Sequence, residues 1–189
     1  MSQIYIEINQ ADLKKVTSKL KDLEKAPNHL KNAINRTATQ AMKMIREGRS
    51  QGYTIKAGRF NKDIRIQRAN AAHLDATIKA SGRPPTLSKS FKTSYPKAGG
   101  KADITKSGLK RLVTATGGAA FIPPGGKAAG LMAQRRGSER HPIKVLYGNS
   151  VPKMVEKIWE GERGGQGEME DKVRKHLHEE IQKEIARLM

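Results

Sequence analysis

The distribution of charge along the chain is the feature that most constrains how it folds. Residues 29–150 contain 24 basic and 5 acidic residues, whereas segments 1–28 and 151–189 carry net charges of only +1 and −1. The whole excess of +19 therefore belongs to the middle of the chain. Like charges repel one another in a compact state, so this part must expose its cations or meet an anionic partner. A basic surface that serves only solubility explains the charge equally well.

Hydrophobic periodicity predicts a strand and two helices at the N-terminal end. Isoleucines at every second position from Ile4 to Ile8 indicate a short strand with one buried face. Apolar residues at helical spacing then predict helices over residues 9–25 and 28–47, with Gly48 as a C-terminal cap. Pro27 separates the two helices, and the small residues of the second one allow another backbone to approach closely.

The C-terminal end is predicted to be helical as well. A short helix is expected over residues 151–160, followed by a glycine-rich hinge at 161–167. A final amphipathic helix is expected over 168–188, with acidic residues in its first turn, as the helix dipole favours. Its apolar stripe consists of Met169, Val173, Leu177, Ile181, Ile185 and Leu188.

Between these ends the pattern is that of short strands and loops. Alternating apolar residues predict a strand at 74–80, which Gly82 and the two following prolines end. Further short strands are expected at 102–105, 109–113, 119–122, 131–133 and 143–147, with a turn at 95–100 and a loop at 123–127. The sequence therefore predicts an α+β fold: an N-terminal strand and two helices, a central antiparallel sheet with long basic loops, and a C-terminal amphipathic helix.

No pattern of catalytic or metal-binding residues is evident in the sequence. The chain has no cysteine, and its five histidines form no HExxH motif. His176 and His178 are two positions apart on a predicted helix, so they point in different directions. The glycine-rich segments match neither the P-loop pattern GxxxxGK(S/T) nor the dinucleotide-binding pattern GxGxxG. We therefore expect no enzyme activity and no cofactor, and no run of apolar residues approaches the length of a membrane span.

Two stretches carry motifs in a characteristic order. The first is AINRTA at 33–38, then a basic tract at 53–69 and LDATIKASGRP at 74–84. The second is RRG at 135–137, followed by HPIKVLYGNSVPKM at 141–154. Together they resemble the minor tail protein Z family of long-tailed bacteriophages, and the resemblance covers most of the chain.

The resemblance implies a tail completion protein that acts at the head-proximal end of the tail and makes it competent to join the head. It implies no catalytic residues. The expected organisation is a single domain over 1–189, with a basic core region at 28–160 ahead of the hinge and last helix. Joints of virions are cyclic, so a homo-oligomeric ring is expected, with a hexamer as its size. The protein would be assembled in the host cytoplasm and then reside in the virion.

The basic middle of the chain is the expected contact region. Its partners would be tail terminator, tail tube or head–tail connector proteins, with non-specific contact to phage DNA as a further possibility. The residues chosen as contacts for an acidic protein face or for DNA are Arg83, Arg135, Arg136, Arg140 and Lys144. Three alternatives remain open at this stage: a sequence-independent nucleic-acid-binding protein, a tail terminator, and a phage nuclease.

Overall fold

The computed structural model describes residues 2–7, 26–115, 117–165 and 169–187. The helix predicted at 9–25 lies outside these residues. The helices are α2 (Ala26–Gly52), α3 (Ala57–Lys62), α4 (Leu87–Ser90), α5 (Val151–Trp159) and α6 (Met169–Ala186). The strands are β1 (Ser2–Glu7), β2 (Ile64–Gln67), β3 (Asp75–Ala80), β4 (Lys92–Ser94), β5 (Lys101–Asp103), β6 (Lys110–Arg111), β7 (Ala133–Arg135) and β8 (Ile143–Val145).

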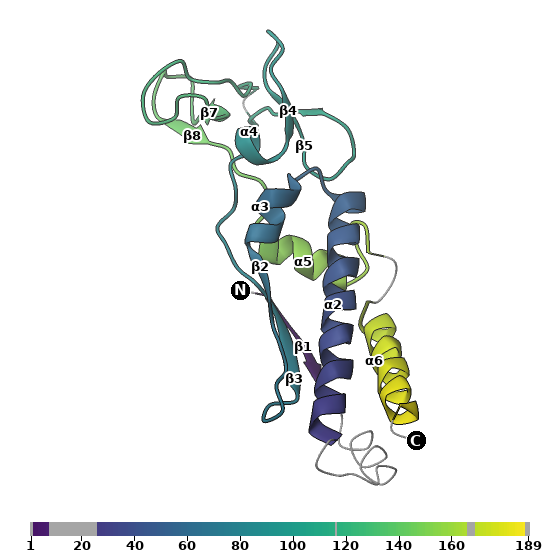
Figure 1. The fold of residues 1–189 in the computed structure, drawn as a ribbon. Coiled ribbons are helices and arrows are strands. Elements are labelled where there is room, and N and C mark those ends of the chain that lie inside the picture. Colours follow the sequence, from purple (N-terminus) through teal and green to yellow (C-terminus); the bar gives the residue numbers. More distant parts are fainter. Residues whose placement is uncertain (1, 8–25, 116, 166–168, 188–189) are drawn as a thin grey trace.

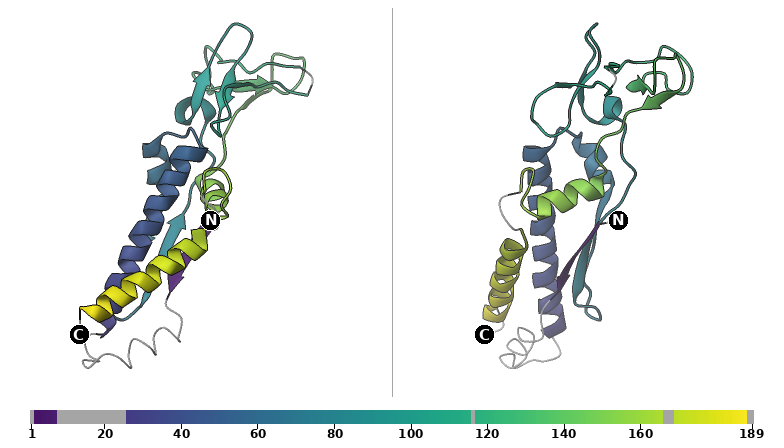
Figure 2. Two further views of the ribbon diagram at one scale, coloured as in Figure 1. Left: turned by 90° about the vertical axis from the view of Figure 1, so that its right-hand side faces the viewer. Right: turned by 180° about the vertical axis from the view of Figure 1, so that it is seen from behind.

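The molecule is elongated, with α2 as its long axis (Figure 1). The sheet β1-β3-β2 lies on one side of α2 and α6 on another, while α5 crosses near the middle (Figure 2). We call these elements, together with α3, the body. Residues 82–150 contain α4 and β4–β8 and gather at the C-terminal end of α2, and we call them the head. The α+β class predicted from the sequence is confirmed.

The sheet of the body has one apolar face. Ile4 of β1 and Ile66 of β2 lie opposite Ile78 of the central strand β3, and both pairings are antiparallel. Ile4 and Ile78 are buried, whereas Gln3, Arg65 and Lys79 in the next row are exposed. This alternation buries one side of the sheet, whereas the other side carries exposed side chains around the buried Thr77. The strands predicted from Ile4 and at 74–80 are confirmed as β1 and β3.

Helix α2 is longer than the sequence pattern predicts. It begins at Ala26, so Pro27 occupies its first turn, where a missing N–H costs no intrahelical hydrogen bond. The prediction that Gly48 caps the helix was wrong, because the helix continues through it to Gly52. Gly48 is buried within the helix, where a Cβ would overlap the side chain of Ile158 from α5. Its small size therefore serves packing, not termination.

The small-residue face of α2 packs inside the molecule. Ala33, Ala38 and Ala41 are fully buried, and α2 contacts both α6 and β3. The stripe of α6 is buried from Met169 to Ile185, which confirms the predicted amphipathic helix over the described residues. Helix α5 is also confirmed, and it buries one face against α2 and the sheet.

The strands of the chain are distributed over three small antiparallel sheets. In the head, β4-β5-β6 form one sheet and β7-β8 form another. The predicted strand at 119–122 supplies only two isolated bridges, through Ala119 and Phe121. No element was predicted within the tract 53–69, yet it forms α3 and β2, and the alternation of Ile64 with Ile66 was a usable signal. One apolar cluster runs from the body into the head.

Candidate partner-binding surface

Four of the five predicted contact residues lie on one hairpin of the head. Arg135 lies on β7 and Lys144 on β8, while Arg136 and Arg140 lie in the connection between the two strands. All four are exposed. Arg83 is exposed too, but it lies on the segment that leads from β3 into the head. The structure thus brings four of these residues together on one hairpin and leaves Arg83 on a separate segment.

The base of this hairpin is anchored in the apolar cluster. Met132 and Ala133 are fully buried, and the main chain of Ala133 exchanges two hydrogen bonds of 2.9 Å with Phe121. Leu146 N donates to Met132 O over 2.8 Å. A buried base and a polar tip explain why this short two-stranded sheet presents its cations outward.

Arg135 is oriented by an aromatic ring. Its guanidinium lies over Phe121, 5.6 Å from the ring centroid. A cation at this distance is attracted by the negative face of the ring, by about 0.5–1 kcal/mol at an exposed site. The contact restricts the side chain without neutralising it, so Arg135 keeps its charge for an external anion.

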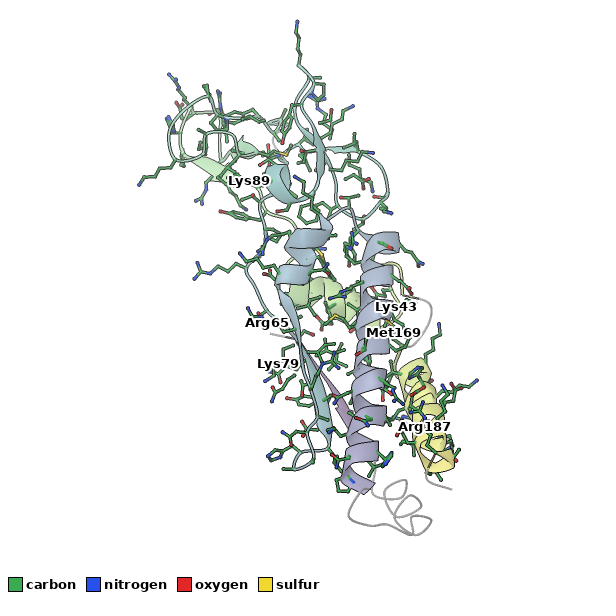
Figure 3. All side chains as sticks on the ribbon, in the orientation of Figure 1. Lys43, Arg65, Lys79, Lys89, Met169 and Arg187 are labelled. Carbon is green, nitrogen blue, oxygen red and sulfur yellow. The ribbon has the colours of Figure 1, made fainter. Side chains whose placement is uncertain are left out.

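The cations of the head form no ion pairs among the described residues. Residues 82–150 contain 13 basic residues and only two acidic ones, Asp103 and Glu139. Asp103 is buried, and among the described residues no ion pair involves any of these 13 cations. Figure 3 shows their side chains projecting around the head, with Lys89 labelled. The head is therefore a strongly positive surface at one end of the molecule.

Apolar side chains are exposed on the same part of the molecule. Six large hydrophobic residues of the described chain are exposed, and five of them belong to the head: Tyr95, Leu109, Val113, Ile122 and Tyr147. Cations and exposed apolar groups occur together at protein interfaces, where the apolar groups are covered and the charges select the partner. The head therefore combines the two chemistries that a protein partner requires.

The sequence did not suggest an ion-pair network between α2 and α6. Glu184 of α6 accepts a hydrogen bond from His29 Nδ1 over 2.7 Å and contacts Arg36 of α2. Glu180 lies 3.3 Å from the same guanidinium. Both carboxylates are buried, at 6% and 3% exposure for Glu180 and Glu184. Glu180 and Glu184 follow Leu177 by three and seven residues, so on a helix they lie beside the apolar stripe. This spacing is the sequence signal from which their burial could have been predicted.

The network shifts the pKa of its members. Burial alone raises the pKa of Glu184, but the hydrogen bonds from His29 and Arg36 outweigh it, so the pKa is lowered. The hydrogen bond from Lys183 lowers the pKa of Glu180, and Arg36 adds to this effect against burial. The pKa of Arg36 is raised in turn, chiefly by Glu184. These shifts favour the charged forms of the two carboxylates and of the Arg36 guanidinium.

The histidines and acidic residues form no recognisable metal centre in the part of the chain that the structure describes. His176 Nδ1 lies 3.4 Å from Thr37 Oγ1, whereas His178 is exposed. None of the described helices has the length and apolar character needed to cross a membrane.

Comparisons with known proteins add no relative to this picture. No protein-family model matches the chain, and neither the curated proteins nor the solved structures contain a match. The family resemblance noted above therefore depends on the motifs of this sequence alone.

Proposed function

We propose that this chain is a structural virion protein that completes the head-proximal end of a phage tail and enables head–tail joining. The observation that carries the proposal is the head: a cationic surface without internal ion pairs among the described residues, at one end of an elongated body. It acts through protein–protein contacts, in a homo-oligomeric ring for which six subunits is the proposed number. Its neighbours are tail terminator, tail tube or connector proteins, and it carries out no chemical reaction.

The motifs that carry the family resemblance occupy structural positions. Arg36 of AINRTA joins α2 to α6. Gly82 has a φ of 131° and packs against the carboxylate of Asp63. In the second stretch, a Cβ on Gly148 would overlap the ring of Phe91, and Met154 is fully buried. These residues pack the body and its junction with the head, which is consistent with a structural role.

The mixture of cations and apolar groups favours a protein partner over nucleic acid. A passage for moving DNA should not hold phosphates tightly, because each neutralised phosphate strengthens binding. Exposed aliphatic residues such as Leu109 and Val113 gain nothing from a phosphate backbone, whereas a protein interface buries them.

Electron microscopy of lysates from a phage with a nonsense codon in this gene tests the proposal. Filled heads beside unattached tails of normal length are expected. Overlong tubes would instead assign the protein as a terminator, and normal infectious particles would contradict both roles. Complementation with charge reversal of Arg135, Arg136, Arg140 and Lys144 to Glu should fail. The matched control reverses four exposed cations of the body and should restore joining: Arg46, Lys56, Lys62 and Lys175.

The same unpaired cations support a second candidate, sequence-independent binding of nucleic acid. Fluorescence anisotropy with a duplex oligonucleotide over a series of salt concentrations tests it. Each phosphate contact contributes about −0.9 to the slope of log K against log salt. If DNA is the partner, reversing the four hairpin cations should make that slope shallower by about 3 to 4. Binding that is unchanged in this variant would remove the hairpin from any DNA contact.

A further inference from the structure

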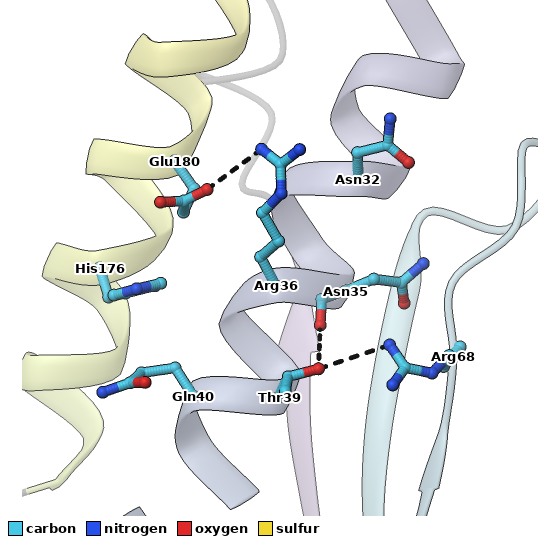
Figure 4. A pocket seen from close by; sticks show the side chains of 8 residues that line it. All are labelled: Asn32, Asn35, Arg36, Thr39, Gln40, Arg68, His176 and Glu180. Carbon is cyan, nitrogen blue, oxygen red and sulfur yellow. Dashed lines mark hydrogen bonds and ion pairs between the residues drawn. The ribbon is translucent and has the colours of Figure 1, made fainter. Parts of the chain in front are cut away.

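A polar trough lies on one face of the body, between α6 and Arg68 (Figure 4). Its floor is the exposed side of α2, where Asn32, Arg36 and Gln40 follow one another at intervals of four residues. Arg68, just after β2, borders one side, and Glu180 of α6 borders the other. The hollow has a volume of about 460 Å³.

The hydrogen-bonding groups of this trough are only partly used. The side-chain amides of Asn32 and Gln40 have no hydrogen-bond partner among the described residues, and Arg68 reaches only Thr39 Oγ1, at 3.4 Å. Amide and guanidinium groups on a concave surface offer both donors and acceptors to a polar ligand.

The strand β2, which ends one residue before Arg68 of the trough, has an open outer edge. It pairs with β3 alone, and its main chain makes no further hydrogen bonds to the described residues. In such an edge strand, alternate residues direct their N–H and C=O groups away from the sheet, where they form a template for another strand.

Asn35 shows how the molecule satisfies the end of this edge. Its side-chain amide donates to Ala69 O over 3.0 Å and accepts from Ala69 N over 2.9 Å. A neighbouring strand would make the same pair of contacts with its main chain. The side chain thus replaces a strand at Ala69, whereas the four residues of β2 itself keep their outer edge free within the described chain.

The charge beside this edge favours an anionic partner. Arg65 of β2 lies directly opposite Lys79 of β3, and both side chains are exposed on the outer face of the sheet (Figure 3). Like charges directly opposite each other on a sheet are destabilising. No described carboxylate pairs with either cation. A carboxylate beside Arg65, on a strand added to the edge, would relieve this repulsion.

We propose that the β2 edge and the trough form a docking site for an extended acidic segment of a partner protein. The segment adds a strand to β2 through its main chain. Successive side chains of a strand point to opposite faces, so carboxylates at every second position face Arg65, and the polar residues between them face α2. The site lies on the body and is independent of the role proposed for the head.

A peptide of five Thr-Glu repeats is the probe for this site. Threonine favours the extended conformation and glutamate supplies the carboxylates. Binding to the full chain is followed by fluorescence anisotropy, and the contacted residues by NMR amide exchange. We expect saturable binding and slower exchange at alternate residues of β2. The same peptide with alternate N-methylated amides loses half of its main-chain donors and should bind at least tenfold more weakly.

Two variants and a matched control locate the peptide. Asn32→Trp fills the trough from an exposed position, and Arg65→Glu reverses the cation beside the edge, so each should weaken binding at least tenfold. Arg46→Trp places the same ring on an exposed position of α2 that does not line the trough, and should leave binding unchanged.

Several results would overturn the proposal. Equal binding of the N-methylated peptide would show charge attraction without strand pairing. Absence of saturable binding up to concentrations on the order of millimolar would remove the site. Protection of β2 amides that grows with protein concentration, without peptide, would assign the edge to a second copy of this chain. Protection of these amides by duplex DNA would assign it to nucleic acid.

Discussion

At the scale of single residues, several glycines allow segments of the backbone to approach one another closely. A Cβ on Gly52, at the end of α2, would overlap the main-chain carbonyl of Arg163. Gly164 in turn packs against the main chain of Gly48 and Gly52. The predicted hinge at 161–167 therefore contains glycines with a packing role, and its motion stays a prediction. Gly82 and Gly164 also have positive φ angles, of 131° and 99°, so backbone conformation and close contact both favour glycine at these two positions.

Replacement of Gly82 by alanine should destabilise the protein by about 2–4 kcal/mol. The strained backbone contributes about 1–3 kcal/mol and the overlap with the Asp63 carboxylate a similar amount. Urea denaturation followed by circular dichroism measures the change. Gly58→Ala is the control: Gly58 lies in α3 with open space around its Cα, so alanine should stabilise by about 0.5–1 kcal/mol. Equal stability of the two variants would contradict this explanation.

At the scale of elements, α6 is held to α2 by apolar packing and by two buried carboxylates. Glu180 and Glu184 share the guanidinium of Arg36, and Lys183 and Arg187 cover them from the solvent side. Removing one member of such a pair leaves the other charge poorly compensated, so the network is sensitive to single changes. The helix itself was predictable, whereas its partner helix was not, because His29 and Glu184 are 155 residues apart in the chain.

The carboxylates of α6 should make stability depend on pH in the acid range. Their pKa values are lowered on folding from an ordinary 4.5, so their contribution is present above pH 4.5 and is lost as the pH falls through the lowered values. Glu184→Gln should cost about 1–3 kcal/mol at neutral pH and less in acid. Denaturation curves between pH 7 and 3 measure both effects.

The control for this pH experiment replaces exposed carboxylates. Glu156→Gln and Glu179→Gln change side chains in solvent on α5 and α6, and should leave the pH profile close to that of the original protein. If Glu184→Gln kept the full acid dependence, the network would not be its source.

At the scale of the whole molecule, charge and shape are coupled. The body pairs many of its charges internally, while the head keeps its cations unpaired among the described residues. The cations of the head are therefore close to one another at one end of the molecule, and no described ion pair offsets their mutual repulsion. Salt screens such repulsion between exposed charges over about 10 Å at 0.1 M.

Added salt should therefore stabilise the protein. We expect Tm to rise by a few degrees between about 20 and 300 mM sodium chloride, because screening weakens repulsion within the head. Differential scanning calorimetry measures it. Neutralising Arg135, Arg136, Arg140 and Lys144 to Gln should raise Tm at low salt and reduce the salt effect. A fall of Tm with salt would mean that exposed ion pairs of the body outweigh the head.

The predicted and observed elements agree where periodicity is local. The alternation from Ile4, the strand ending before Gly82 and the stripe of α6 each follow from neighbouring residues on one face. The predicted boundary at Gly48 was wrong, and the close contact of this glycine with Ile158 of α5 joins residues far apart in sequence. The four cations of the hairpin lie together because they are close in sequence. Arg83 is far from them in sequence and lies on a separate segment.

The sequence by itself determined the α+β class, most elements and the location of the positive charge, because these depend on spacing and composition along the chain. Only the tertiary structure decided which elements touch. It distributed the described strands over three sheets, buried Glu180 and Glu184 against Arg36, and left an open outer edge on β2, which leads to Arg68 of the polar trough. Such features depend on contacts between residues far apart in sequence, and no local pattern encodes which distant partner a side chain meets.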